Sequence, residues 1–358
     1  MAYNNLYKWG LSVLFEQQAQ IYEGMFLARV TEQRRNLYRV VCENGFLQAT
    51  VSGKFMHEAH SDADYPAVGD WVTICVENDA AVIHYVLPRK SVFGRRAVGT
   101  VNESQIIASN IDTVFICMAL NTDYNLRRLE RYLSIAWDSG ATPVIVLTKS
   151  DLCENLEQKR AEVLEISSGA SVIVCSNLEQ GGYNDVTQHI NQGETIAFIG
   201  SSGVGKSTLI NYLLGQDVLA TKEVRNDGKG RHTTTHRQLM LLPCGGLVMD
   251  NPGMRELGAV SADLEKTFAD IGAFAEQCRF SDCSHTSEPG CAVRAAIEDG
   301  ILNAARLGNY NKIQMEAGYS GLSSRQIEEE KIRRMFGGKG EMKKTLRSIR
   351  EKNNHRSI

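Results

Sequence analysis

The sequence lacks the features of an exported or membrane-spanning protein. It opens without a basic, apolar leader, and no apolar run approaches the roughly 20 residues that cross a bilayer. We therefore expect a cytoplasmic protein without a membrane partner, whose nine cysteines stay reduced rather than forming disulfides. The sequence also has no internal repeat, so we expect no repeat architecture.

The net charge is small and negative, at −3 over 358 residues, which by itself argues against a nucleic-acid-binding protein. The distribution of charge argues the other way, because residues 331–358 hold ten Lys and Arg against two Glu, a net of +8. A basic segment of this kind is suited to bind the phosphate backbone of a nucleic acid, although many basic termini only keep a chain soluble. The length exceeds one ordinary core and indicates two or three domains.

Residues 200–207, GSSGVGKS, match the phosphate-loop pattern G-x-x-x-x-G-K-[ST] without mismatch. The apolar run 195–199 before them is typical of a buried strand, and residues 208–214 continue as a helix. Backbone N–H groups and the helix N-terminus cradle phosphates, Lys206 reaches the β- and γ-phosphates, and Ser207 binds Mg²⁺. The predicted nucleotide-binding residues are Gly200, Ser201, Ser202, Gly203, Val204, Gly205, Lys206, Ser207 and Thr208.

A second strand-like run, residues 144–147, ends at the tetrapeptide TKSD, which supplies Thr148, Lys149 and Asp151. The Asp151 carboxylate can accept two hydrogen bonds from guanine, which adenine cannot supply. Lys149 would lay its aliphatic stem along the base. Four common residues mean little alone, but their place at a strand end favours a guanine site. An ATP-using phosphate-loop protein is the alternative, excluded if Asp151 faces guanine.

Other strand ends carry polar residues too. The run 247–249 leads into a D-x-x-G motif, in which Asp250 holds Mg²⁺ through water and the Gly253 amide senses the γ-phosphate. The run 171–174 leads to Ser176, a weaker candidate for contact with the base. Together with the strand-like run 112–120 and helical stretches at 127–139 and 156–168, these runs predict a doubly wound, mostly parallel sheet that binds ligands at its carboxyl edge.

The order of the two nucleotide motifs is inverted. Ordinary GTPases place the phosphate loop before the guanine motif, whereas here residues 148–151 precede residues 200–207. Each motif follows a strand of its own, so it emerges at the same sheet edge whatever the strand order. The sequence therefore predicts a circularly permuted GTPase.

The loop at residues 229–236, KGRHTTTH, lies where a switch segment offers a threonine to Mg²⁺ and the γ-phosphate. Thr234 is the first choice for that ligand and Thr235 the second. Met254 occupies the position after D-x-x-G where Ras-like enzymes use glutamine to orient water, so another group must do so. His232 is the nearest candidate, which makes Lys206, Thr234 and His232 the predicted catalytic set. The alternatives are Arg255 or a His232 that is merely solvated.

Cys278, Cys283, His285 and Cys291 gather three thiols and an imidazole within residues 278–291. Tetrahedral zinc accepts such a set readily, and soft thiolates exclude Mg²⁺ and Ca²⁺. We therefore predict one Zn²⁺ per chain. The other six cysteines occur singly and are interpreted as core or inert residues.

The N-terminal part alternates short apolar runs with breaks, at residues 25–31, 37–42, 46–52, 70–76 and 80–86. Five short strands suit a small barrel, and the OB-fold is the RNA-binding barrel with that strand count, although other five-stranded barrels remain open. Scattered cations on this part could face RNA or simply be solvated: Arg34, Arg35, Arg39 and Lys54.

The motif order TKxD, GxSGVGKST, GRHTTT and DxPGxRE resembles the ribosome small subunit-dependent GTPase A family, also known as YjeQ or YloQ. The resemblance covers nearly the whole chain, including GDWV at residues 69–72 and LPRKS at 87–91. Thr148 and Asn251 depart from it, since asparagine is commoner at the first position in GTPases and threonine at the second in this family. The loss of an amide at Thr148 suggests modest guanine affinity.

This resemblance implies a multidomain α/β protein with an N-terminal OB-fold barrel, a central permuted GTPase domain and a C-terminal helical zinc domain. It also implies action in late assembly of the small ribosomal subunit, contact with rRNA, and GTP hydrolysis stimulated by the subunit. We expect a monomer. A nucleic-acid-binding protein that senses GTP with little turnover is the alternative from another class. The expected divisions are an extension at 1–20, the barrel at 21–98, the GTPase domain at 99–260, the zinc domain at 261–335 and a basic tail at 336–358.

Overall fold

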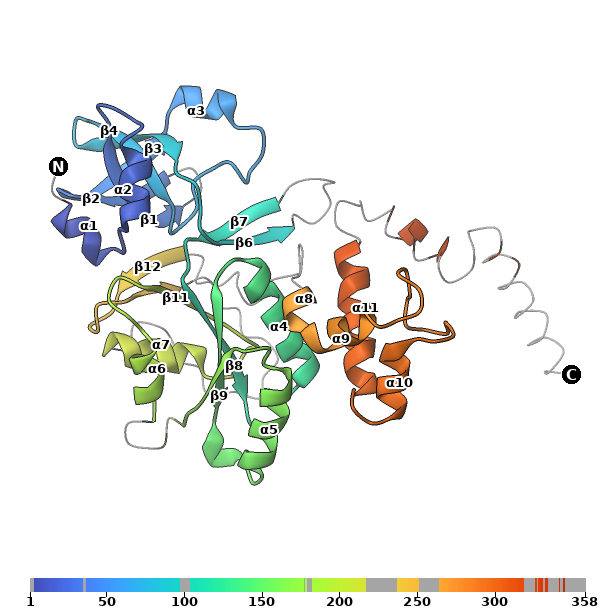
Figure 1. Ribbon diagram of the computed structural model, residues 1–358. Coiled ribbons are helices and arrows are strands. Elements are labelled where there is room, and N and C mark those ends of the chain that lie inside the picture. The colour runs from blue at the N-terminus through green and yellow to red at the C-terminus, as the bar shows by residue number, and fades with distance from the viewer. Residues whose placement is uncertain are drawn as a thin grey trace, which may run out of the picture.

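A computed structural model describes residues 3–34, 37–96, 104–176, 178, 182–216, 237–250 and 264–318, with isolated positions between 326 and 344. An eleven-stranded sheet runs through most of the molecule in the order β10-β9-β8-β11-β13-β12-β1-β2-β3-β5-β4. One end of this sheet curls into the N-terminal barrel, and the C-terminal helices lie apart on the opposite side of the central sheet (Figure 1).

Five strands form the barrel, and they coincide closely with the five apolar runs in the sequence. An additional pairing of β1 with β4 closes the ring, and α3 (Gly53–Glu58) connects β3 to β4. The inward side chains include Val30, Val40, Ile74 and Ile83, all fully buried, because alternate residues of each strand face the interior. The prediction of a five-stranded, OB-like barrel is confirmed. The strands are β1 (Phe26–Arg34), β2 (Leu37–Cys42), β3 (Gly45–Val51), β4 (Trp71–Glu77) and β5 (Ala80–Val86).

The central sheet has five parallel strands, as the sequence predicted, and one antiparallel strand, β12. Strands β8 and β11 are buried along their whole length because helices cover both faces: α4 and α5 pack on one, α6 and α7 on the other. The strands are β8 (Thr113–Ala119), β9 (Thr142–Thr148), β10 (Ser171–Val174), β11 (Thr195–Ile199), β12 (Arg237–Leu241) and β13 (Leu247–Asp250); the helices are α4 (Leu126–Asp138), α5 (Leu156–Ile166), α6 (Asn184–Gln188), α7 (Lys206–Leu214) and the 3₁₀ turn η1 (Ser150–Leu152).

The junction between barrel and central sheet was not foreseen. Strand β12 pairs with β13 on one side and with barrel strand β1 on the other, through Glu32 opposite Gln238 and Gln33 opposite Arg237. A hairpin of β6 (Val92–Arg96) and β7 (Ser104–Ser109) spans the expected division between residues 98 and 99. The backbone ladder therefore continues from the barrel into the nucleotide-binding sheet.

Two helices lie within the segment 1–20, which was expected only as an N-terminal extension. Helices α1 (Asn4–Lys8) and α2 (Val13–Ala19) lie beside the barrel and bury Leu6, Trp9 and Phe15 in the same core as Trp71. This segment therefore packs against the body of the protein (Figure 1).

The C-terminal part is helical, with a core of its own built from Phe268, Ile271, Val293 and Ile313. Its elements are α8 (Leu264–Thr267), α9 (Ala269–Ala275), α10 (Ala292–Glu298) and α11 (Ala304–Gly318). Most of the basic segment 331–358 lies outside the described residues. Among the helices that are described, none has the length and apolar character to cross a membrane.

Candidate nucleotide and zinc sites

The phosphate loop connects the end of β11 to the start of α7, the context that the sequence predicted. Gly200 has a φ of +143°, and a Cβ there would lie 2.4 Å from the Cys117 carbonyl oxygen of neighbouring β8, so only glycine fits. Burial raises the pKa of the Cys117 thiol to about 12, which keeps this cysteine neutral and inert under the loop.

The buried Lys206 ammonium donates to the carbonyl oxygens of Gly200 at 2.7 Å and Ser201 at 2.5 Å. Lys206 therefore lies against the phosphate loop, where the anionic oxygens of a bound phosphate could replace these two carbonyl acceptors. The other loop residues differ in exposure: Val204 is buried, Ser202 and Gly203 are exposed, and Gly205, Ser207 and Thr208 are intermediate.

The guanine motif contacts the phosphate loop directly. The Thr148 hydroxyl donates to the Val204 carbonyl at 2.6 Å, and the Lys149 ammonium donates to the Gly203 carbonyl at 2.8 Å. Lys149, which makes the second of these bonds, adopts a left-handed φ of +59°. Threonine at position 148 thus joins the two motifs through its hydroxyl, a contact that the comparison with asparagine had not anticipated.

The predicted base-contacting Ser176 is buried and donates its hydroxyl to the Asp151 carboxylate. This bond leaves acceptor sites of the exposed Asp151 for another donor. Ser176 therefore orients the Asp151 carboxylate.

Asp250 is placed by the register of the sheet. Met249 lies opposite Ala197 in the parallel pair of β13 and β11, so Asp250 lies one step further, toward the phosphate loop. The remaining predicted groups, His232, Thr234, Thr235, Gly253 and Arg255, are outside the described residues, and their roles stay predictions.

Asp123 is a polar contact of the phosphate loop that the sequence analysis missed. It follows β8 and accepts a hydrogen bond from the Ser201 hydroxyl. Its position could have indicated this role, because Asp123 follows the last residue of a buried strand by four residues. Ligands bind beyond the carboxyl ends of the strands in such sheets.

The four predicted zinc ligands lie together, with their ligand atoms within 4.8 Å of one another. Cys278 Sγ and Cys291 Sγ are 3.9 Å apart, and His285 Nδ1 lies 3.6 Å from the first and 3.5 Å from the second. Tetrahedral Zn²⁺ separates two thiolate sulfurs by about 3.8 Å, and sulfur from imidazole nitrogen by about 3.6 Å. The donor set therefore fits zinc in both chemistry and spacing.

Glu288 stabilises the loop between two of these ligands. Its carboxylate accepts from the backbone N–H groups of Ser284, Thr286 and Ser287, each at 3.0 Å, and from the Ser284 hydroxyl. The Ser284 hydroxyl, followed by these backbone donors, holds the pKa of Glu288 well below its usual range. The loop thereby holds His285 at a left-handed φ of +58°.

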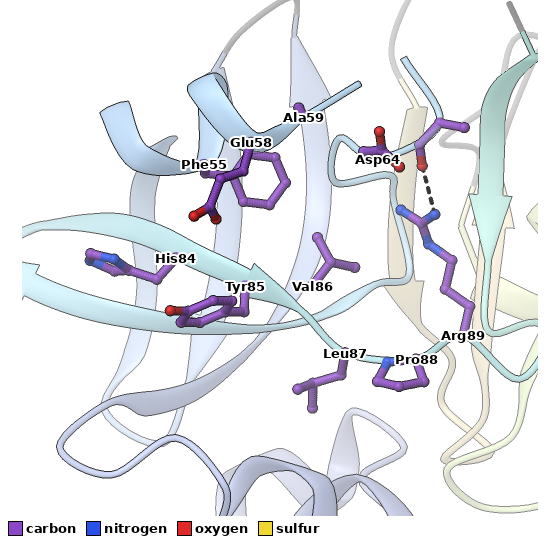
Figure 2. Close-up of a pocket in the computed structure, with 11 residues that line it drawn as sticks. Phe55, Glu58, Ala59, Asp64, His84, Tyr85, Val86, Leu87, Pro88 and Arg89 are labelled. Carbon is purple, nitrogen blue, oxygen red and sulfur yellow. Dashed lines mark hydrogen bonds between the residues drawn. The ribbon is translucent and has the colours of Figure 1, made fainter. Parts of the chain in front are cut away.

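A separate pocket of about 380 Å³ opens on the barrel (Figure 2). Phe55 and Glu58 of α3 face Tyr85 and Val86 of β5, while Arg89 at its rim donates to the Ala63 carbonyl at 2.8 Å. None of its lining residues belongs to a nucleotide or zinc motif, so this pocket is distinct from the candidate sites.

Comparison with known proteins agrees with this geometry. The family model described as RsgA GTPase matches residues 86–260. The chain is 54% identical over 342 residues to "Small ribosomal subunit biogenesis GTPase RsgA 2" of Lactiplantibacillus plantarum, covering 95% of this chain and 97% of the relative. It is 44% identical to "Small ribosomal subunit biogenesis GTPase RsgA 1" of Listeria innocua, covering 88% and 90%.

Two solved structures share the fold. YjeQ from Thermotoga maritima superposes with a TM-score of 0.61 at 27% identity, over 82% of this chain and 98% of that one. YloQ, described as a circularly permuted GTPase, gives 0.59 at 25% identity, over 83% and 96%. The two sequence relatives cover 95% and 88% of this chain. The chain therefore belongs to the RsgA family of GTPases.

Proposed function

We propose that this protein hydrolyses GTP to GDP and phosphate and acts in maturation of the small ribosomal subunit. The observation that carries the proposal is the contact between the two motifs: Thr148 and Lys149 bind carbonyls of the phosphate loop while Asp151 stays exposed beside it. Because the two motifs are in contact, one nucleotide can place its base at Asp151 and its phosphates in the loop. The names of the relatives supply the biological process.

In this proposal Ser207, Asp250 and Thr234 hold Mg²⁺, which neutralises charge that develops on the phosphates. Lys206 supports the β- and γ-phosphates, and His232 orients the attacking water. Cys278, Cys283, His285 and Cys291 hold one structural Zn²⁺.

The proposed partner is the small subunit with its rRNA, bound by a cytoplasmic monomer. On the barrel, the exposed Arg39 guanidinium lies 4.4 Å from the centre of the exposed Phe46 ring, an arrangement on which unpaired bases can stack. The basic residues of 331–358 suit the RNA backbone.

Single-turnover GTP hydrolysis with and without purified small subunits tests the function. We expect subunits to raise the rate; an unchanged rate would contradict a role in assembly. Asp151→Asn should weaken GTP binding by on the order of 10² or more, because a donor then faces the guanine amine. Equal GTP affinity in this variant would sink the guanine assignment.

The same assay distinguishes the role of Lys206 from that of His232. Lys206→Ala should damage both GTP affinity and turnover. His232→Ala should leave affinity within a few-fold and cut stimulated hydrolysis by roughly 10². Unimpaired turnover in His232→Ala would transfer the role to Arg255 or to a ribosomal group.

A further inference from the structure

The phosphate loop is held by residues outside its own motif. One Asp123 carboxylate oxygen accepts from the Ser201 hydroxyl, and the other pairs with Arg128 at 2.8 Å. The Ser201 carbonyl also accepts from Lys206. Ser201 is therefore fixed through its side chain by Asp123 and through its backbone by the phosphate-binding lysine.

Asp123 lies in the loop before helix α4, and Arg128 lies in the first turn of that helix. Arg128 donates its backbone N–H to the capping Asn125 side chain at 3.0 Å and its guanidinium to the Asp123 carbonyl oxygen. The loop after β8 and the first turn of α4 thus form one hydrogen-bonded unit. A shift of Ser201 would be transmitted to this turn.

The same helix carries a buried contact with the C-terminal helices at 264–318, called here the zinc-binding part. Glu130 is 3% exposed and accepts from Arg306 and Asn309 of α11. Arg306 also binds Asp270 through two bonds, at 2.6 and 2.8 Å, and the Thr267 carbonyl at 2.9 Å. Burial raises the pKa of Glu130, and the Arg306 guanidinium opposes that shift, so separating the two would strand a buried polar group.

Helix α4 is therefore linked to the phosphate loop through Asp123, which pairs with Arg128 of its first turn, and it contacts the C-terminal helices immediately beyond that turn. In Figure 1 it lies between the central sheet and helices α8, α9 and α11. Asn309 additionally donates to the Arg127 carbonyl at 3.3 Å, which places α11 against the same first turn that contains Arg128. Within the described residues, side-chain bonds at Asp123, Arg128 and Glu130 link the phosphate loop through α4 to the zinc-binding part.

We propose that Asp123 is a positioning residue for the phosphate loop, and that α4 couples nucleotide binding to docking of the zinc-binding part through Glu130, Arg306 and Asn309. This inference rests on the proposed function, since it assumes that the loop binds guanine nucleotide. Coupling between binding sites is reciprocal, so a change at either end of α4 must alter the free energy at the other.

The test is GDP affinity of the full chain with zinc bound, measured by displacement of a fluorescent GDP analogue. Asp123→Asn should weaken GDP by roughly fivefold to twentyfold, within the usual range of coupling between sites. Asn309→Ala, which removes no contact to the phosphate loop, should weaken it by about threefold, and the double variant should fall short of the product of the two effects. Arg131→Ala, on the same helix, is the control and should change affinity less than about twofold.

Hydrogen exchange provides a readout that a general loss of stability would not mimic. GDP should increase amide protection of α11 in the parent protein and should do so less in Asp123→Asn at an unchanged zinc content. If Asp123→Asn does not fold, Ser201→Ala removes the same hydrogen bond from the other side and should give the same loss of protection.

The outcomes are distinguishable. Parent-like GDP affinity in both Asp123→Asn and Ser201→Ala would overturn the positioning role. Unchanged GDP affinity in Asn309→Ala, with no response of α11 to GDP, would overturn the coupling. A parent protein that fails to bind GDP would instead refute the proposed function.

Discussion

The barrel and the zinc-binding part are joined to the central sheet in different ways. The barrel shares a backbone ladder with it through β1 and β12, and the core cluster that contains Trp71 of the barrel continues to Val114 of β8. The C-terminal helices have a separate core and meet α4 through buried polar bonds centred on Arg306 and Glu130. The first joint is apolar and continuous; the second is mainly polar, and it also includes the Ser168 hydroxyl bonded to the Thr267 carbonyl and Lys266 over the Trp137 ring.

This difference has a physical consequence. Apolar burial and a shared ladder resist separation at every residue, so the barrel and the nucleotide-binding sheet should unfold together. A polar joint depends on a few precise bonds and loses stability abruptly when one partner is removed. We therefore expect the zinc-binding part to be the unit that changes position in response to the nucleotide.

Loss of the metal should have the largest effect. It should separate the unfolding of the zinc-binding part from that of the barrel and central sheet. Cys283→Ser should release zinc and expose residues 264–318 to exchange, because structural zinc contributes about 10–16 kcal/mol to small zinc-binding folds. Hydrogen exchange with mass spectrometry, alongside elemental analysis of one zinc per chain, measures this. Cys244→Ser, which alters an exposed thiol outside the cluster, is the matched control. Equal loss of protection in β8 and β11 would contradict a separate unit.

The barrel joint is best tested at Arg29. This buried side chain donates to the carbonyls of Gly69 and Trp9 and to the Thr195 hydroxyl, so it ties the barrel to the strand that carries the phosphate loop. Burial lowers the pKa of Arg29 to about 10, which leaves it charged at neutral pH. Arg29→Met should reduce the free energy of unfolding by about 3 kcal/mol, because these acceptors lose a charged donor.

Urea unfolding followed by tryptophan fluorescence measures this loss, with the exposed Arg34→Met as control. The transition should remain single for barrel and sheet. Two resolved transitions would show that the ladder and core do not hold these parts together.

A smaller effect is expected at the polar joint between α4 and α11. Glu130→Gln keeps the shape of the side chain but replaces one acceptor with a donor that faces Arg306 and Asn309. We expect a loss of about 2 kcal/mol in docking, seen as faster exchange in α11 with the barrel unchanged. Glu298→Gln, at an exposed position of α10, is the control and should leave α11 exchange as in the parent.

The exposed pair at the same joint should matter least. Arg131 and Glu316 lie 2.9 Å apart, but each side chain is about one-third exposed. Arg131→Ala should therefore cost less than about 1 kcal/mol in α11 protection, because solvent screens such pairs. An effect as large as that of Glu130→Gln would mean that the joint is held from its surface.

Local patterns in the sequence predicted the elements that depend on local chemistry. Apolar runs of strand length gave the five barrel strands and the parallel sheet, whose ranges agree with the structure within a few residues. The spacing of Cys278, Cys283, His285 and Cys291 predicted a cluster that the structure brings together. The order of the nucleotide motifs carried the resemblance to the family to which the chain belongs.

The tertiary structure alone decided how these parts are joined. Pairing of β1 with β12 depends on which strand edges meet, and the sequence pattern of a strand does not specify its neighbour. The Ser201–Asp123 bond joins residues 78 positions apart, and the Arg306–Glu130 bond joins residues 176 apart. Such contacts leave no periodic signal, because each depends on a single side chain meeting a distant partner. The sequence by itself thus determined the chemistry of the sites, whereas packing decided which element connects them.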